Sequence, residues 1–291
     1  LHGLGYNTYT KLFHACVAPI LDYCSGVWGY KTYGKIDTVQ NRAVRVFLGV
    51  HAFAPNAAIN GDMGWSQSQC RRKIEMLRLW NRLVNMSDQR LTKHVFNWDY
   101  VTLRNNWSTE VQTIFSDLNC ENTFDVKDPI SLNLTQAKFY EKQCNEWENS
   151  VNRFPKLRTY IEYKTTFKTE PYVQKSMGTK YRSILARFRC GILPLEIEVR
   201  RYQHDENWHR EICKICKATV LEDEKHFFFD CKHYDVPRFV YWNEIENKIP
   251  GFKNLSINDK LKAVMQDNVV VCTAKFIWDI FKMRQNCMYD N

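Results

Sequence analysis

The chain has 291 residues, of which 44% are hydrophobic and 14% aromatic, enough for a folded core and too many for a disordered chain. Its 11 glycines and 8 prolines are too few for a turn-rich all-β protein, so we expect a mainly α-helical fold. The net charge of +9 indicates a polyanionic partner.

Helical spacing of apolar residues predicts five helices in the first half of the chain. They cover residues 8–23, residues 36–48 with Gly49 as C-cap, residues 66–84 after a capping box at Ser66 and Gln69, residues 108–118, and a stretch after Thr135. Their expected inward faces are Leu12, Cys16, Pro19 or Ile20, and Tyr23; Ile36, Val39, Ala43 and Val46; Cys70, Ile74, Leu77, Trp80 and Val84; Val111, Ile114, Phe115 and Leu118; Phe139 or Tyr140, Cys144, Trp147 and Val151.

The second half of the chain has weaker periodicity at first. Residues 119–129 are polar and turn-prone, so we expect a linker there, and residues 157–167 are expected to form a strand or an extended arm. Helices are predicted over residues 178–190, 256–266 and 270–288. No stretch approaches the ~20 apolar residues that span a bilayer, so no membrane partner is expected.

The strongest chemical motif is Cys213-x2-Cys216, followed by His226 and Cys231. Zinc prefers four sulfur or nitrogen ligands in a tetrahedron, and a C-x2-C turn can place two thiolates on one ion. These four residues leave no open position for a catalytic water, so the sequence predicts a structural Zn²⁺. His209 and His233 are alternative fourth ligands, but His226 is favoured because Phe227, Phe228 and Phe229 follow it and would form an apolar cluster beneath the metal.

The remaining cysteines among the eleven are scattered along a long, aromatic-rich chain. This pattern differs from the dense disulfides of small secreted proteins. It predicts a reducing intracellular compartment, the nucleus or the cytoplasm.

Positive charge is concentrated between Arg153 and Arg189, where ten basic residues face two acidic ones, a net of +8. Arginine heads beside the apolar stripe of helix 178–190 could hold phosphates, although snorkelling of long side chains over the core is the alternative. Tyr160, Tyr163, Phe167 and Tyr172 could stack on bases or pack in the core. The predicted nucleic-acid contacts are Lys164, Lys168, Lys175, Lys180, Arg182, Arg187, Arg189 and Arg201.

Two sets of motifs carry a resemblance to a known family. The first set comprises residues 187–198, Arg201-Tyr202, Arg210, the zinc motif with residues 221–231, Tyr234 and Arg238. It resembles the C-terminal region of reverse transcriptases encoded by LINE-type (non-LTR) retrotransposons, where a Cys-Cys-His-Cys knuckle follows a basic helix. Residues 17–23, 27–29, 36–40 and 43–45 resemble the helical thumb beyond the polymerase palm. The chain departs from the family pattern at Arg200, where a glycine is expected, and at Lys232, where a proline is frequent.

The resemblance implies four segments: a thumb-like helical segment (1–65), a helical linker region (66–152), a basic segment with the zinc knuckle (153–250) and a C-terminal helical tail (251–291). No Asp-Asp dipeptide of the polymerase motif occurs, so we expect no polymerase chemistry from this chain alone. It would grip template RNA or target DNA, with a palm in a longer parent protein as a possible partner and no small-molecule substrate. A zinc-scaffolded protein-interaction module, host-adopted or degenerate, and a decayed copy without function are the alternatives.

Overall fold

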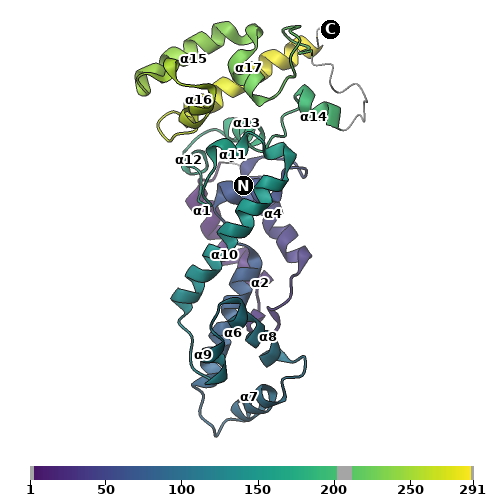
Figure 1. Cartoon of the computed structure of the whole chain (residues 1–291), viewed down its shortest axis with the longest axis vertical. Helices are drawn as coiled ribbons and strands as arrows, with labels where there is room; N and C mark the ends of the chain where they lie inside the picture. Colours follow the sequence, from purple (N-terminus) through teal and green to yellow (C-terminus); the bar gives the residue numbers. More distant parts are fainter. Residues whose placement is uncertain (1–2, 202–211, 290–291) are drawn as a thin grey trace. The chain divides into compact units, whose positions relative to one another are not determined.

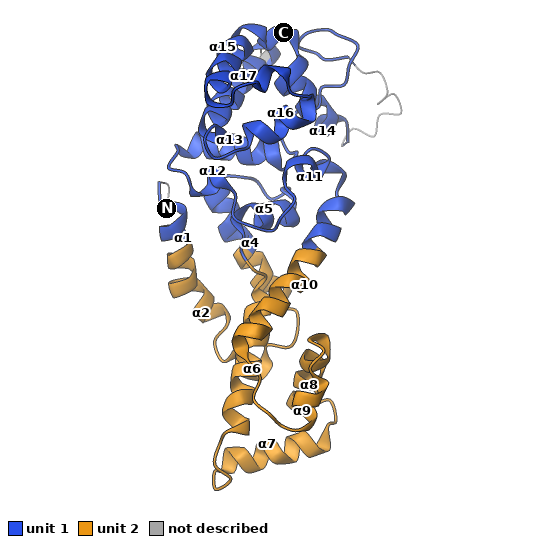
Figure 2. Ribbon diagram, turned by 60° about the vertical axis from the view of Figure 1, so that its left-hand side comes forward, with its two compact units in different colours: residues 1–9, 41–65, 147–291 blue, residues 10–40, 66–146 orange. Residues whose placement is uncertain are grey.

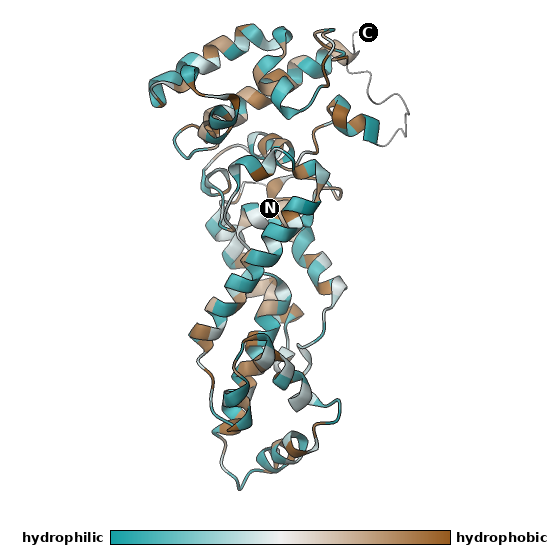
Figure 3. Ribbon diagram, in the orientation of Figure 1, coloured by the Kyte–Doolittle hydropathy of each residue, from teal (hydrophilic) through white to brown (hydrophobic). Residues whose placement is uncertain are grey.

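The chain folds into helices (Figure 1), and this computed structural model describes residues 3–201 and 212–289. No β-strand occurs among those residues, which confirms the mainly α-helical fold. Most helices carry hydrophilic and hydrophobic residues together (Figure 3), as amphipathic helices do. Within the described ranges, no helix combines the length and apolar character that a bilayer crossing requires.

The longer helices supply most of the packing surface. They are α4 (Gly34–Leu48), α5 (Asn56–Met63), α6 (Ser68–Val84), α7 (Leu91–Thr102), α8 (Trp107–Asp117), α10 (Leu132–Arg153), α13 (Thr179–Arg189), α15 (Asp235–Lys248), α16 (Ile257–Val264) and α17 (Val270–Tyr289). Short helices connect them: α1 (Tyr6–Leu12), α2 (Ala18–Leu21), α3 (Ser25–Trp28), α9 (Glu121–Asp125), α11 (Tyr160–Tyr163), α12 (Pro171–Gln174) and α14 (Glu196–Arg201), with π-helices at Phe13–Val17 and His226–Asp230 and 3-10 helices at Pro155–Leu157, Lys232–Tyr234 and Phe252–Asn254.

The chain divides into two compact units, which Figure 2 colours separately. Unit 1 comprises residues 1–9, 41–65 and 147–291, and unit 2 comprises residues 10–40 and 66–146. The helices α4 and α10 contribute residues to both units. These units describe contacts in space, whereas the four expected segments describe order along the chain, so the four-segment division stays a prediction.

Unit 2 is built around the side chain of Trp80 on α6. Its ring lies 5.5 Å from Phe96 on α7, 5.3 Å from Phe115 on α8 and 5.1 Å from Phe124 on α9, measured between centroids. The Trp80 indole nitrogen donates a hydrogen bond to the Asp128 carbonyl at 3.0 Å, so its one polar atom is satisfied. The expected inward positions of α8, together with Leu77 and Trp80 on α6, are confirmed as buried.

The prediction of a linker at residues 119–129 is wrong. This segment contains α9, and Phe124 within it is buried against Trp80 in the core of unit 2. Polar composition suggested a linker, but one buried aromatic side chain and the carbonyl of Asp128 tie the segment to α6.

Unit 1 has an aromatic core shared by α13, α15 and α17. The ring of Phe228, in the second π-helix, lies 5.6 Å from Phe188 on α13 and 5.2 Å from Phe276 on α17. Phe276 in turn stacks on Tyr241 of α15, with 4.4 Å between centroids. Aromatic contacts through Phe228 and Phe276 therefore link α13, α15 and α17.

The two apolar faces expected near the N-terminus are wrong. In the first helical region Ile20 is 77% exposed, whereas Phe13 and Ala18 are buried. A π-helix at Phe13–Val17 interrupts the regular α-helical period on which the prediction depended. In α4, Val39 and Val46 are exposed while Val44 and Phe47 are buried. Gly49 does end α4, with a φ of +69° and its amide donating to the Arg45 carbonyl at 2.8 Å, as predicted for a C-cap.

The prediction of a strand or extended arm at residues 157–167 is also wrong. The segment instead forms the end of a 3-10 helix and the short helix α11. Tyr160, on α11, and Phe167 are buried, so aromatic residues of this segment pack in the core.

Candidate metal centre

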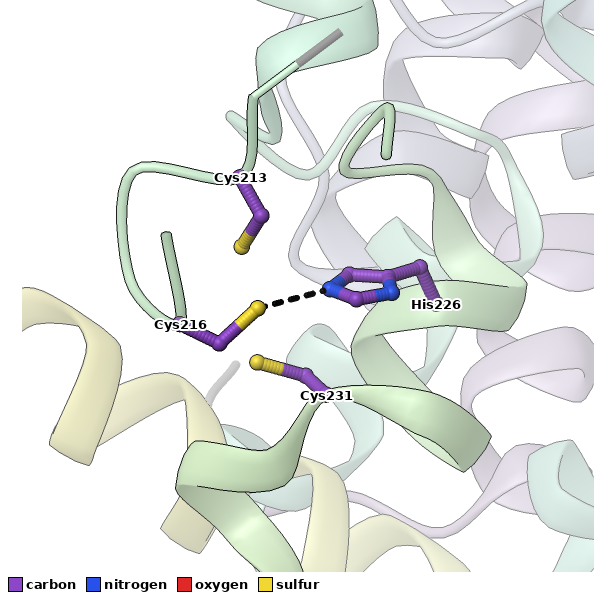
Figure 4. A group of neighbouring side chains, drawn as sticks. All are labelled: Cys213, Cys216, His226 and Cys231. Carbon is purple, nitrogen blue, oxygen red and sulfur yellow. Dashed lines mark hydrogen bonds between the residues drawn. The ribbon is translucent and has the colours of Figure 1, made fainter. Parts of the chain in front are cut away.

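Three sulfur atoms and one imidazole nitrogen converge between a turn and a short π-helix (Figure 4). Cys213 and Cys216 lie in the turn, His226 begins the π-helix, and Cys231 directly follows it. The ligand atoms of the four residues all lie within 4.8 Å of one another. The structure thus brings together all four residues of the predicted motif.

The spacing of these atoms suits a tetrahedral zinc ion. Zn–S bonds near 2.3 Å and Zn–N bonds near 2.0 Å place two donors of a tetrahedron about 3.5–3.8 Å apart. The Cys216 Sγ and His226 Nε2 atoms are 3.5 Å apart, within that range. The widest separation, at most 4.8 Å, needs shifts of only about 1 Å to close around an ion.

The turn that presents the first two cysteines is shaped by its own backbone. The Cys213 amide donates to the Ala218 carbonyl at 2.9 Å, and the Lys217 amide donates to the Cys213 carbonyl at 2.8 Å. Lys217 has a φ of +60°, a left-handed conformation that residues other than glycine rarely adopt. This reversal directs both thiols toward the same point.

The electrostatic environment prepares some donors better than others. Burial opposes ionisation of Cys216, but the Ala218 amide and the Cys213 thiol donate to its sulfur and leave its pKa below the ordinary value. Burial raises the pKa of Cys213 and of Cys231. Burial also lowers the pKa of His226, which favours the neutral imidazole that binds metals. The positive charge of a divalent ion would stabilise the thiolate forms of Cys213 and Cys231, which burial disfavours.

A buried arginine holds the backbone around the last ligand. Arg238 on α15 donates from Nε to the Phe228 carbonyl at 3.1 Å and from Nη2 to the Cys231 carbonyl at 2.9 Å. Phe227, Phe228 and Phe229, which directly follow His226, are all buried, and the rings of Phe228 and Phe229 lie 4.7 Å apart. Hydrogen bonds from Arg238 and the burial of three phenylalanines therefore hold the segment between His226 and Cys231 in place.

Two buried glutamates just before His226 anchor the module, and sequence reasoning missed both. Glu222 accepts two hydrogen bonds from Arg284 of α17, each 2.7 Å, and Glu224 accepts two from Arg158, at 2.8 and 2.6 Å. Burial nevertheless raises the pKa of Glu224 to about 7. The sequence carried no clear signal for this contact, because α17 also contains Lys275, Asp279 and Lys282 and nothing in that pattern marks Arg284 as a buried partner.

The alternative fourth ligands are resolved only in part. His233 does not belong to the four-residue group, and its Nε2 lies 3.2 Å from the Cys287 sulfur instead. His209 lies outside the described residues, as do Tyr202 and Arg210 of the family resemblance. Among described histidines, His226 is the one that joins the cysteines.

Three of the predicted nucleic-acid contacts are corrected because their side chains are buried. Arg189 donates to both Asp62 oxygens at 2.8 Å and lies 2.7 Å from Glu170. Lys164 pairs with Glu170 at 2.6 Å, and the Arg182 Nε donates to the Phe47 carbonyl at 2.9 Å. These heads are held inside unit 1, so they have no surface from which to contact a phosphate.

The other predicted cations lie nearer the surface. Lys168 and Lys180 are exposed and Arg187 is half-buried. Lys175 and Arg201 are engaged by carboxylates, at 2.8 Å from Asp267 and 3.0 Å from Glu198. Of the predicted stacking rings, Tyr160, Phe167 and Tyr172 are buried, in agreement with the core-packing alternative.

Comparison of the chain with models of protein families, with curated proteins and with solved structures gives no match. The resemblance to LINE-type reverse transcriptases therefore stays a prediction from the sequence motifs.

Proposed function

We propose that this chain is a zinc-stabilised, helical nucleic-acid-binding protein. The observation that carries the metal part is the closed set of four donors, Cys213, Cys216, His226 and Cys231, within 4.8 Å of one another. Three thiolates and one neutral imidazole on Zn²⁺ fill its tetrahedron and leave no position for water or substrate. The ion would therefore hold the fold of the module, and the residues around it supply packing rather than catalysis.

The nucleic-acid part is supported by charge. The chain carries a net charge of +9, and Lys168 and Lys180 place part of it on the surface of unit 1. A cationic surface attracts the phosphate backbone of RNA or DNA without reading sequence. We propose that the chain grips template RNA or target DNA as the C-terminal portion of a LINE-type reverse transcriptase, with polymerase chemistry performed elsewhere.

The metal part is tested by zinc content and chelation. Protein purified with zinc should contain one equivalent of the metal, and removal of it should lower the melting temperature. Cys216→Ser should lose the zinc, whereas Cys16→Ser, at an exposed cysteine outside the four-residue group, should retain it. A melting temperature that chelators leave unchanged would refute a structural ion.

The nucleic-acid part is tested by the salt dependence of binding. The affinity for a single-stranded oligonucleotide should fall steeply between about 50 and 200 mM salt, because phosphate contacts release counterions. Affinity that is absent at low salt, or that does not respond to salt, would contradict this part of the proposal while leaving the zinc module intact.

A second candidate function, a zinc-scaffolded protein-interaction module, is favoured by one feature of unit 2. Helix α7 buries Phe96 but turns a second apolar face outward. That exposed face is formed by Leu91, Val95, Trp98 and Val101, which recur at helical spacing, and Trp98 is 69% exposed. Such a face binds protein more readily than phosphate. Stoichiometric recovery of one defined protein, lost in Trp98→Gln, would support this candidate, and recovery of RNA alone would exclude it.

A further inference from the structure

Two arginines of unit 1 hold opposite ends of one loop, residues 49–55. The Arg187 Nη2 on α13 donates to the Gly49 carbonyl at 3.4 Å. The Arg45 Nη2 on α4 donates to the Ala54 carbonyl at 2.9 Å and to the Asn56 side chain at 2.6 Å. The loop carries His51 and Phe53 between these two anchors, so cationic and aromatic groups gather on one surface of the unit.

Three cations of this surface lie close enough to His51 to affect its pKa. The pKa of His51 is lowered first by partial burial and then by the positive charges of Arg187, Lys156 and Arg45, while a hydrogen bond to the Ile192 backbone acts in the opposite direction. Lys156 comes from the 3-10 helix Pro155–Leu157, so three separate elements direct cations toward the loop.

These cations differ from the buried arginines in what balances them. In the described parts of the chain, no ion pair joins Arg45 or Arg187 to a carboxylate; their Nη2 atoms donate to carbonyl and amide oxygens, and the Nε of each is buried without a hydrogen bond. Lys156 pairs with Glu198 at 3.3 Å. Arg189, by contrast, is matched to two carboxylates. Arg45 and Arg187 thus carry positive charge that no carboxylate of the described residues pairs with.

An aromatic ring stands beside that charge. Phe53 is 72% exposed, and its ring centroid lies 5.7 Å from that of His51 in an edge-to-face arrangement. The Phe53 amide donates to the His51 Nδ1 at 3.3 Å, so His51 fixes the orientation of this part of the loop. An exposed ring flanked by cations is the arrangement by which proteins hold single-stranded nucleic acid, with bases on the ring and phosphates on the cations.

We infer that this loop surface is a binding site for single-stranded nucleic acid, in which Arg45, Lys156 and Arg187 hold the phosphate backbone and Phe53 stacks on a base. The inference rests on the proposed nucleic-acid function and gives that function a location that the sequence did not predict, since only Arg187 was among the expected contacts. His51 is a positioning residue that holds the loop.

Fluorescence anisotropy with a labelled oligouridine of about 20 nucleotides tests the site. Phe53→Ala should weaken binding on the order of tenfold, because stacking on one base is lost. Arg187→Gln should weaken binding and reduce the slope of log affinity against log salt by about 0.7, the value for one phosphate contact on a single strand. Lys262→Gln, which removes one exposed charge of unit 1 far from the loop in sequence, should change neither quantity by comparable amounts.

The outcomes separate this inference from the function on which it rests. If the wild-type chain binds the oligouridine and both loop variants bind it equally well, the site is wrong and the proposed function stands. If the wild-type chain binds no oligonucleotide, both fall. Phe53 is exposed, so its variant should fold normally; an unchanged melting temperature and zinc content confirm that a lost affinity reflects the site.

Discussion

The two units of this chain solve the problem of a stable core in different ways. Unit 2 surrounds Trp80 with phenylalanine rings and has no buried ion pair at that centre. Unit 1 places charged groups in its interior, including the Asp62–Arg189 pair, and adds four side chains that are placed to hold a metal ion. Apolar burial depends little on pH or metal, whereas buried charge and ligated metal depend on both. Unit 1 should therefore respond to pH and metal more strongly than unit 2, whose buried charges include Arg72, 3.8 Å from Asp22.

The largest expected effect comes from removing a zinc ligand. Cys231→Ser should cost the module most of its metal-binding free energy, which is on the order of 10 kcal/mol for a structural zinc site. Hydrogen exchange should accelerate in residues 213–241 and remain slow in α6 and α8. Equal acceleration in α6 would show that the two units do not respond separately and would break the comparison.

A mutation in the core of unit 2 should have the opposite pattern: it should destabilise unit 2 and leave the metal site intact. Trp80→Ala should destabilise unit 2 by about 3–5 kcal/mol, because it removes a large fully buried ring and leaves a cavity. Zinc content should remain that of the wild type. A variant that folds but has lost its zinc would contradict the assignment of the metal to unit 1 alone.

The buried ion pair of unit 1 should have an intermediate effect. Asp62 accepts hydrogen bonds from Arg189, Tyr160 and Tyr172, and all four side chains are buried or nearly so. Asp62→Asn removes one of the two carboxylates that pair with the buried Arg189, leaving Glu170, and should cost about 3 kcal/mol. Asp267→Asn, at an exposed ion pair with Lys175, is the matched control and should cost less than about 1 kcal/mol. Chemical denaturation of both variants measures the difference.

The same pair predicts how stability changes with pH. Burial raises the pKa of Asp62, but the charge and hydrogen bonds of Arg189 outweigh it and leave the pKa below the ordinary value. A carboxyl whose pKa is lower in the folded state stabilises the fold above its unfolded pKa of about 3.9, and that stability is lost as pH falls below this value. Wild-type protein should lose stability in this acid range, and Asp62→Asn should lose less. Parallel pH profiles would show that Asp62 does not contribute.

How far the sequence predicts this structure depends on the kind of interaction. The zinc motif was predictable because its residue types and spacing are dictated by coordination geometry, and the Trp80 and α8 positions because long helices have a clear period. The charged network was not, because burial of Arg189 depends on Asp62, 127 residues away in the chain. Arg182 and Arg189 lie on the same helix, α13, as Lys180 and Arg187, and only the folded contacts separate the buried heads from those nearer the surface.

The smallest effect on stability is expected at the outward face of α7. Trp98→Gln replaces an exposed ring and should change the free energy of unfolding by less than about 0.5 kcal/mol, since surface substitutions remove little packing. Trp80 and Trp98 are thus two tryptophans of one unit with opposite expected roles, one for the core and one for a partner. If Trp98→Gln destabilised unit 2 as strongly as Trp80→Ala, the α7 face would be part of the fold, and the protein-interaction candidate would lose the observation that favours it.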